Sequence, residues 1–167
     1  MRFGTSGGSG PLQTTWRRDS IPLARPFAYH GAMKGRPIIV HSLAEARAAV
    51  AAAADLGVPV TLASAPEAAG YLGALWVREL VRMASEERPE ARVSALIDCG
   101  DQPGHVMAAL RQGLKRVRFT GPKTTAETLG SLASQYDAEI VTGPLRAHDL
   151  MDQAQPETAC RRWLSEA

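Results

Sequence analysis

The sequence is poor in cysteine and in aromatic residues, and it lacks any long apolar run. Its two cysteines, Cys99 and Cys160, form neither a metal-ligand spacing nor a disulfide framework. Two unpaired thiols indicate a protein of the reducing cytoplasm. No stretch of about 18 apolar residues occurs, so we expect no membrane-spanning helix. The first residues do not have the pattern of a signal peptide or of a transit sequence.

An excess of charge of one sign is also missing. The chain has 19 Lys and Arg against 17 Asp and Glu, which leaves a net charge of +2. Such a small excess argues against nucleic acid and against an anionic membrane surface as partners. Neither a His-Glu-x-x-His motif nor a Gly-x-Gly-x-x-Gly motif occurs, which disfavours the zinc-protease and dinucleotide-binding classes.

From Pro37 onward, short apolar runs alternate with segments of helical pattern. The expected strands lie at residues 37–41, 58–63, 92–97, 115–119 and 138–142, and the expected helices at 42–56, 64–87, 103–112 and 124–136. Strands that alternate with helices through short loops predict a parallel sheet with right-handed crossovers. The chain is therefore predicted to be an α/β protein with a five-stranded parallel sheet.

Three tetrapeptides of the form Ser/Thr-x-x-Glu follow apolar runs, at Ser42–Glu45, Ser64–Glu67 and Thr124–Glu127. In such a capping box the hydroxyl accepts from the third helical N–H, and the Glu reaches back to the cap residue. Gly57 and Gly113 suit the left-handed position that closes a helix. These residues predict where the helices begin and end.

Two architectures fit five consecutive βα units. A flavodoxin-like, open doubly wound sheet has the strand order 2-1-3-4-5. Half of a (βα)8 barrel keeps the strands in sequential order and leaves its edges open. The length of the chain favours the doubly wound sheet as a free-standing domain. The alternation resembles both flavodoxin-like domains and aldolase-type half-barrels, and a likeness of architecture does not imply a function.

Composition divides the chain into three regions. Residues 1–36 are rich in glycine, serine and proline and are predicted to form a flexible N-terminal arm. Residues 37–145 form the predicted α/β domain, and residues 146–167 a C-terminal helical tail. Because the arm and the tail also hold apolar residues, we expect each to contact its own domain or a partner subunit of a homo-oligomer.

In either architecture a site belongs at the carboxyl ends of the strands. His41 ends the first apolar run and Asp98 directly follows the third, and both are candidate catalytic residues. The doubly wound order places strands 1 and 3 side by side and brings His41 next to Asp98. The sequential order places His41 beside strand 2 instead. Asp98 is equally suited to accept hydrogen bonds from loop N–H groups.

Two Thr-Gly-Pro turns follow the fourth and fifth apolar runs, at residues 120–122 and 142–144. Glycine allows close approach of the backbone, and a helix N-terminus beside it supplies N–H donors to an anion. Thr-Gly-Pro turns are also common where no ligand binds. Asp101 suits the cap position of the helix that follows it. The candidate ligand-binding residues are Ser42, Asp101, Thr120, Gly121, Lys123, Thr142 and Gly143.

These observations predict a cytoplasmic α/β domain that binds or converts a small anionic metabolite at the carboxyl edge of its sheet. The anionic group would be a phosphate or a carboxylate. The alternative is a non-catalytic module for regulation or for oligomeric assembly. Neither a metal nor a cofactor is predicted from these residues, and both an enzyme and a binding module fit the pattern.

Overall fold

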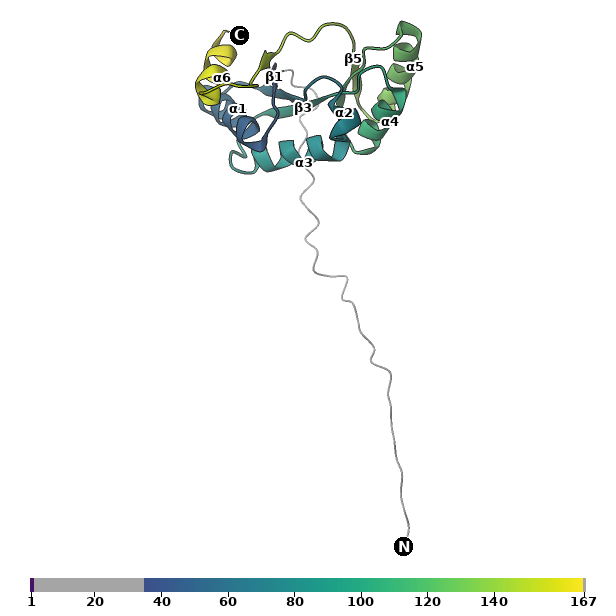
Figure 1. Cartoon of the computed structure of the whole chain (residues 1–167), viewed down its shortest axis with the longest axis horizontal. Coiled ribbons are helices and arrows are strands. Elements are labelled where there is room, and N and C mark those ends of the chain that lie inside the picture. Colours follow the sequence, from purple (N-terminus) through teal and green to yellow (C-terminus); the bar gives the residue numbers. More distant parts are fainter. Residues whose placement is uncertain (2–34, 167) are drawn as a thin grey trace.

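A computed structural model describes Met1 and residues 35–166 (Figure 1). The strands are β1 (Arg36–Ile39), β2 (Val60–Ala63), β3 (Val93–Asp98), β4 (Arg116–Arg118), β5 (Glu139–Val141) and β6 (His148–Asp149). The helices are α1 (Leu43–Leu56), α2 (Ala68–Tyr71), α3 (Ala74–Ser85), α4 (Pro103–Arg111), α5 (Lys123–Ser134) and α6 (Pro156–Ser165). Among residues 35–166, none of the helices has the length and apolar composition that crossing a bilayer requires. The predicted arm lies outside the described residues, apart from Met1, Gly35 and Arg36.

The described strands form one parallel sheet in the order β5-β4-β3-β2-β1-β6. The predicted parallel α/β class is confirmed. Within that class the strand order is the sequential one of the half-barrel alternative, and the doubly wound order that we favoured is not found. The sheet also holds a sixth strand, β6, which pairs with β1.

Sequential order places the crossover helices on one face of the sheet, because each right-handed connection between neighbouring strands turns to the same side. Figure 1 shows α1, α3, α4 and α5 following one another along that side. The strand residues that face these helices are apolar and buried, as Ile38, Leu62, Ala95 and Val117 illustrate. The hydrophobic core therefore lies between the helices and this face.

The opposite face of the sheet carries buried polar side chains beside apolar ones such as Leu96. Thr61 and Ser94 lie opposite each other on β2 and β3, and their hydroxyl oxygens are 2.8 Å apart. The Arg116 guanidinium donates to the Thr61 hydroxyl at 3.0 Å and to the Glu139 carboxylate at 2.6 Å. Because these buried groups hydrogen-bond to one another, the cost of removing them from water is compensated.

Residues 142–147, the crossing segment, connect β5 at one edge of the sheet to β6 at the other. In Figure 1 this segment arches over the side of the sheet opposite α3. A flat six-stranded sheet would place β5 and β6 about 24 Å apart. The seven Cα steps from Val141 to His148 reach at most about 25 Å. Because Gly143 adopts a left-handed turn, with φ at 83°, the segment is not fully extended, so the sheet must curve.

One of the three predicted capping boxes forms in part, at α1. The Ser42 hydroxyl accepts from the Glu45 N–H at 3.2 Å. The Glu45 carboxylate accepts from the N–H of His41, at 2.6 Å, instead of from Ser42. Gly57 and Gly113 follow the ends of their helices in left-handed conformations, as predicted.

The other two predicted capping boxes do not form. Ser64 accepts from the Asp98 N–H at 2.9 Å and so links the end of β2 to the end of β3. The helix expected over 64–87 is divided into α2 and α3, with Gly73 at a φ of 82° between them. The helix α5 begins at Lys123, which places Thr124 inside its first turn.

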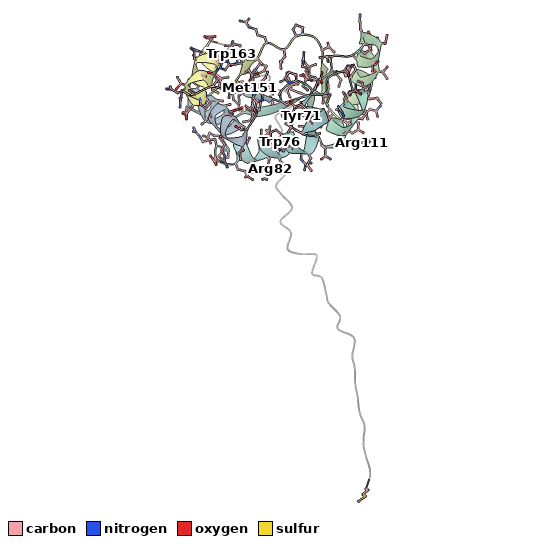
Figure 2. The ribbon with its side chains drawn as sticks, in the orientation of Figure 1. Tyr71, Trp76, Arg82, Arg111, Met151 and Trp163 are labelled. Atoms are coloured by element: carbon pink, nitrogen blue, oxygen red, sulfur yellow. The ribbon has the colours of Figure 1, made fainter. Side chains whose placement is uncertain are left out.

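The C-terminal region is tied to the first strand. The Trp163 indole on α6 donates to the Pro37 carbonyl oxygen at 3.1 Å (Figure 2). The Arg36 guanidinium lies 3.6 Å above the Trp163 ring, and the His148 ring stacks on it with centroids 5.7 Å apart. The predicted helical tail contains the strand β6 in addition to the helix α6. β6 pairs with β1, and α6 contacts β1 through Trp163.

We expect Trp163→Ala to lower the free energy of unfolding by about 2 kcal/mol, as for other losses of a half-buried ring. The variant loses the stacking on His148 and Arg36 in addition to the indole hydrogen bond. Trp163→Phe keeps an aromatic ring and should cost about 1 kcal/mol, the value of one hydrogen bond. Urea titrations followed by circular dichroism measure both changes. Equal losses in the two variants would show that the stacking contributes nothing.

Candidate functional site

Asp98, at the carboxyl end of β3, organises the turns around it. The residue is 4% exposed. Its Oδ1 accepts from the N–H groups of Glu67, at 3.1 Å, and Gly100, at 2.8 Å, and its Oδ2 pairs with the Arg118 guanidinium. Hydrogen bonds to a carboxylate are stronger than those between neutral groups. Both carboxylate oxygens therefore hold neighbouring structure, which fits the anchoring role that the sequence left open for Asp98.

Arg118 extends this network to the crossing segment. Its Nε and Nη2 donate to the Gly143 carbonyl oxygen at 3.3 and 3.1 Å. The same guanidinium pairs with Asp98, and its side chain is only 17% exposed. One arginine on β4 thus fixes the start of the crossing segment relative to β3. Arg118 is not among the site residues predicted from the sequence.

His41 and Asp98 do not lie on neighbouring strands, because β2 lies between β1 and β3. The His41 Nε2 instead lies 2.7 Å from Oδ1 of Asp149 on β6. Burial raises the pKa of Asp149, but hydrogen bonds from the Met151 N–H and from His41 outweigh it and leave the pKa below its usual value. A carboxylate that orients an imidazole is an arrangement suited to proton transfer.

Both cysteines are free and buried. Burial raises the pKa of Cys99 to about 12, and the nearby Asp98 charge adds to the effect. Burial also raises the pKa of Cys160 to about 12. Because the thiolate is the reactive form, neither side chain can act as a nucleophile near neutral pH.

Among the residues that the structure describes, a cavity adjoins the carboxyl ends of the strands between α2 and α4, and another lies beside α5. The cavity between α2 and α4 has a volume of about 270 Å³ and is lined by Glu67, Gly70, Tyr71, Cys99, Gly100, Asp101, Gln102 and His105. Its walls carry the carboxylates of Glu67 and Asp101, which disfavour an anionic ligand. Asp101 was predicted to cap α4. Gln102 occupies the cap position instead. His105 is half-buried against Gly70, where a Cβ would lie 3.1 Å from its ring.

The second cavity, the α5–β5 pocket, has a volume of about 410 Å³. It is lined by Gly121, Lys123, Ala126, Glu127, Gly130, Ile140 and Thr142. Three of these residues, Gly121, Lys123 and Thr142, are among the predicted ligand-binding residues. Gly121 and Thr142 belong to the two Thr-Gly-Pro turns, and Lys123 directly follows the first turn. The pocket therefore brings the two turns to one place, as the parallel sheet requires of neighbouring strand ends.

The N-terminus of α5 opens onto this pocket. Pro122 occupies the cap position, and no described side chain caps the helix. The N–H groups of the first helical turn, at residues 123–125, have no partner within the helix and carry the positive end of its dipole. Gly121 lets the backbone approach the Phe119 ring, which a Cβ at position 121 would overlap. The Lys123 side chain is 90% exposed, which is not the desolvated setting that a Schiff-base lysine needs.

The remaining candidate residues do not line the α5–β5 pocket. Ser42 caps α1, the Thr120 N–H donates to the Gly100 carbonyl oxygen at 2.8 Å, and the Gly143 carbonyl accepts from Arg118. Within residues 35–166, no group of three or more His, Cys, Asp or Glu side chains is arranged to hold a metal ion.

The chain resembles a solved structure in its fold. No protein family model matches the sequence, and no curated protein matches it. Among solved structures, the chain is similar to a "putative fructose-1,6-biphosphate aldolase" from Coccidioides immitis, with 16% identity and a TM-score of 0.51. The match covers 80% of this chain and 53% of that one, so the chain spans about half the length of this structure. At this identity the likeness shows a parallel α/β fold alone.

We expect Asp98→Ala to lower the free energy of unfolding by about 3 to 5 kcal/mol, because it leaves the Arg118 guanidinium without its buried partner. The double variant Asp98→Ala with Arg118→Ala should be less destabilised than the sum of the single variants, by about 1 kcal/mol or more. Denaturant unfolding of the four proteins measures this coupling. Additive effects would contradict a network that runs through the ion pair.

Neither thiol should react with Ellman's reagent in the folded protein at pH 8. A pKa of about 12 leaves almost no thiolate at that pH, and burial excludes the reagent. Both thiols should react in guanidinium chloride, which gives the total for comparison. A thiol that reacts within seconds in the native protein would contradict the burial of that cysteine.

Proposed function

We propose that this chain binds a small anionic metabolite in the α5–β5 pocket, through a phosphate or carboxylate group. The observation that carries this proposal is that Lys123 and the uncapped N-terminus of α5 meet at one cavity. The helix N-terminus supplies N–H donors and a partial positive charge, and Lys123 adds a full charge. The Thr142 hydroxyl, which also lines the cavity, is a further donor for the ligand.

Size and charge favour this pocket over the cavity between α2 and α4. A volume of about 410 Å³ lies within the usual range for small-molecule sites. Lys123 already has a carboxylate near it, since its Nζ is 4.0 Å from Glu127. Exposed pairs of this kind contribute little to stability, so a bound anion can replace the contact at small cost.

The catalytic roles of Asp98 and His41 stay predictions. Asp98 is engaged by the neighbouring turns and Arg118, and His41 lies on the β1 side of the sheet, away from the strand that borders the pocket. The proposal is therefore one of ligand binding first. The cytoplasmic location also stays a prediction, with which the two free thiols are compatible.

Oligomeric assembly is the second candidate function. It is supported by an exposed apolar stretch at the junction of α2 and α3, where Tyr71 is 63%, Leu75 51% and Trp76 36% exposed. Figure 2 shows Tyr71 and Trp76 near each other at this junction. The tail was predicted to dock on its own domain or on a neighbouring subunit, and it packs on α1 and β1 of its own chain. Light scattering over a range of protein concentrations distinguishes a monomer from an assembly.

Inorganic phosphate should bind the wild-type chain with a measurable dissociation constant in isothermal titration calorimetry. Lys123→Gln should weaken this binding about tenfold, as expected for the loss of one charged hydrogen bond. Arg111→Gln removes the same charge from an exposed position on α4 outside the pocket and should leave the affinity within about twofold of the wild type. Equal weakening in both variants would show an effect of net charge alone and would contradict the proposed site.

A further inference from the structure

We infer that the ligand of the α5–β5 pocket is an anion with a compact apolar body, bound head first at the N-terminus of α5. This inference rests on the proposed function, to which it adds the chemical class of the ligand. The pocket has two chemically different halves. Lys123 and Thr142 form a polar half at the carboxyl edge, and Ala126, Gly130 and Ile140 form an apolar half.

The apolar half is a surface that nothing described covers. Ile140 lies in register with Val117, so its side chain projects to the helix side of the sheet. The strand β5 is the edge strand there, and the described residues provide no further helix beyond α5. Ile140 and Ala126 are therefore only half-buried although they belong to the apolar face. An apolar group placed on them would remove this surface from water, which is favourable.

Gly130 keeps this half of the pocket open. Glycine is the poorest helix former apart from proline, and Gly130 lies in the interior of α5. A Cβ at position 130 would meet nothing within 4 Å, so packing within the described structure does not require glycine there. Gly121 differs, because the Phe119 ring would overlap a Cβ at that position. The missing side chain of Gly130 therefore leaves open space in this half of the pocket.

The spacing along α5 sets the length and the charge of the ligand. Lys123, Ala126, Glu127 and Gly130 recur at helical spacing and share one face of the helix. The seven residue steps from Lys123 to Gly130 span about 10 Å of helix axis. A phosphate at the first turn thus leaves room for a body of about the size of a phenyl ring. The Glu127 carboxylate lies between the two ends and disfavours a second anionic group on the ligand.

Calorimetric titration of the full chain with three probes tests this inference. The probes are inorganic phosphate, glycerol phosphate and phenyl phosphate, which share the anionic group and differ in the body attached to it. Phenyl phosphate should bind at least tenfold more tightly than the other two. If none of the three probes binds, the proposed function itself is contradicted. Phosphate binding without any preference for phenyl phosphate would overturn this inference alone.

Substitutions at Gly130 locate the apolar body. Gly130→Leu should fill the apolar half and weaken phenyl phosphate binding at least tenfold, with phosphate binding unchanged. Gly130→Ala is the matched control, because it adds a single methyl group, favours the helix, and should keep the preference for phenyl phosphate. If Gly130→Leu is poorly folded, Gly130→Val provides the same test. If Gly130→Leu or Gly130→Val folds and binds phenyl phosphate as the wild type does, the inference is overturned. The inference is also overturned if the substitution abolishes self-association of the chain and leaves phenyl phosphate binding unchanged.

Discussion

A single buried carboxylate holds the carboxyl edge of this protein together. Asp98 accepts from the turns that follow β2 and β3 and pairs with Arg118 on β4, which in turn holds Gly143 of the crossing segment. A buried charge is unfavourable unless its partners are in place, so these turns and the ion pair are stable only together. Thr142, next to Gly143, lines the α5–β5 pocket, so the anchor at β3 also positions one wall of the proposed site.

The crossing segment imposes a second constraint. Because it joins opposite edges of a six-stranded sheet with few residues, the sheet is curved and its helices follow the outer side (Figure 1). The inner side carries hydroxyl and charged groups that satisfy one another, as Thr61, Ser94 and Arg116 do. Among the described residues, the sequential strand order leaves β5 as an edge strand beside the pocket.

The sequence predicted the strands and most of the helices to within a few residues, because apolar runs and helix-ending glycines are local signals. The sequence also contains a pattern that indicates the strand order. Thr61, Ser94 and Arg116 alternate with apolar residues, whereas strands covered by helices on both faces are apolar almost throughout. Other features depend on distant contacts. Ser64 is engaged by the Asp98 N–H, and β6, which supplies the partner of His41, is too short to have a sequence pattern.

Amide-resolved nuclear magnetic resonance of the chain, titrated with phenyl phosphate, tests the central claim most directly. The claim is that an anion with an apolar body binds between the start of α5 and the end of β5. The account predicts saturable shifts of the amide signals of residues 123–125, 130 and 140–142. Shifts confined to residues 67–71 and 99–105, which border the cavity between α2 and α4, would contradict it, as would the absence of any saturable shift.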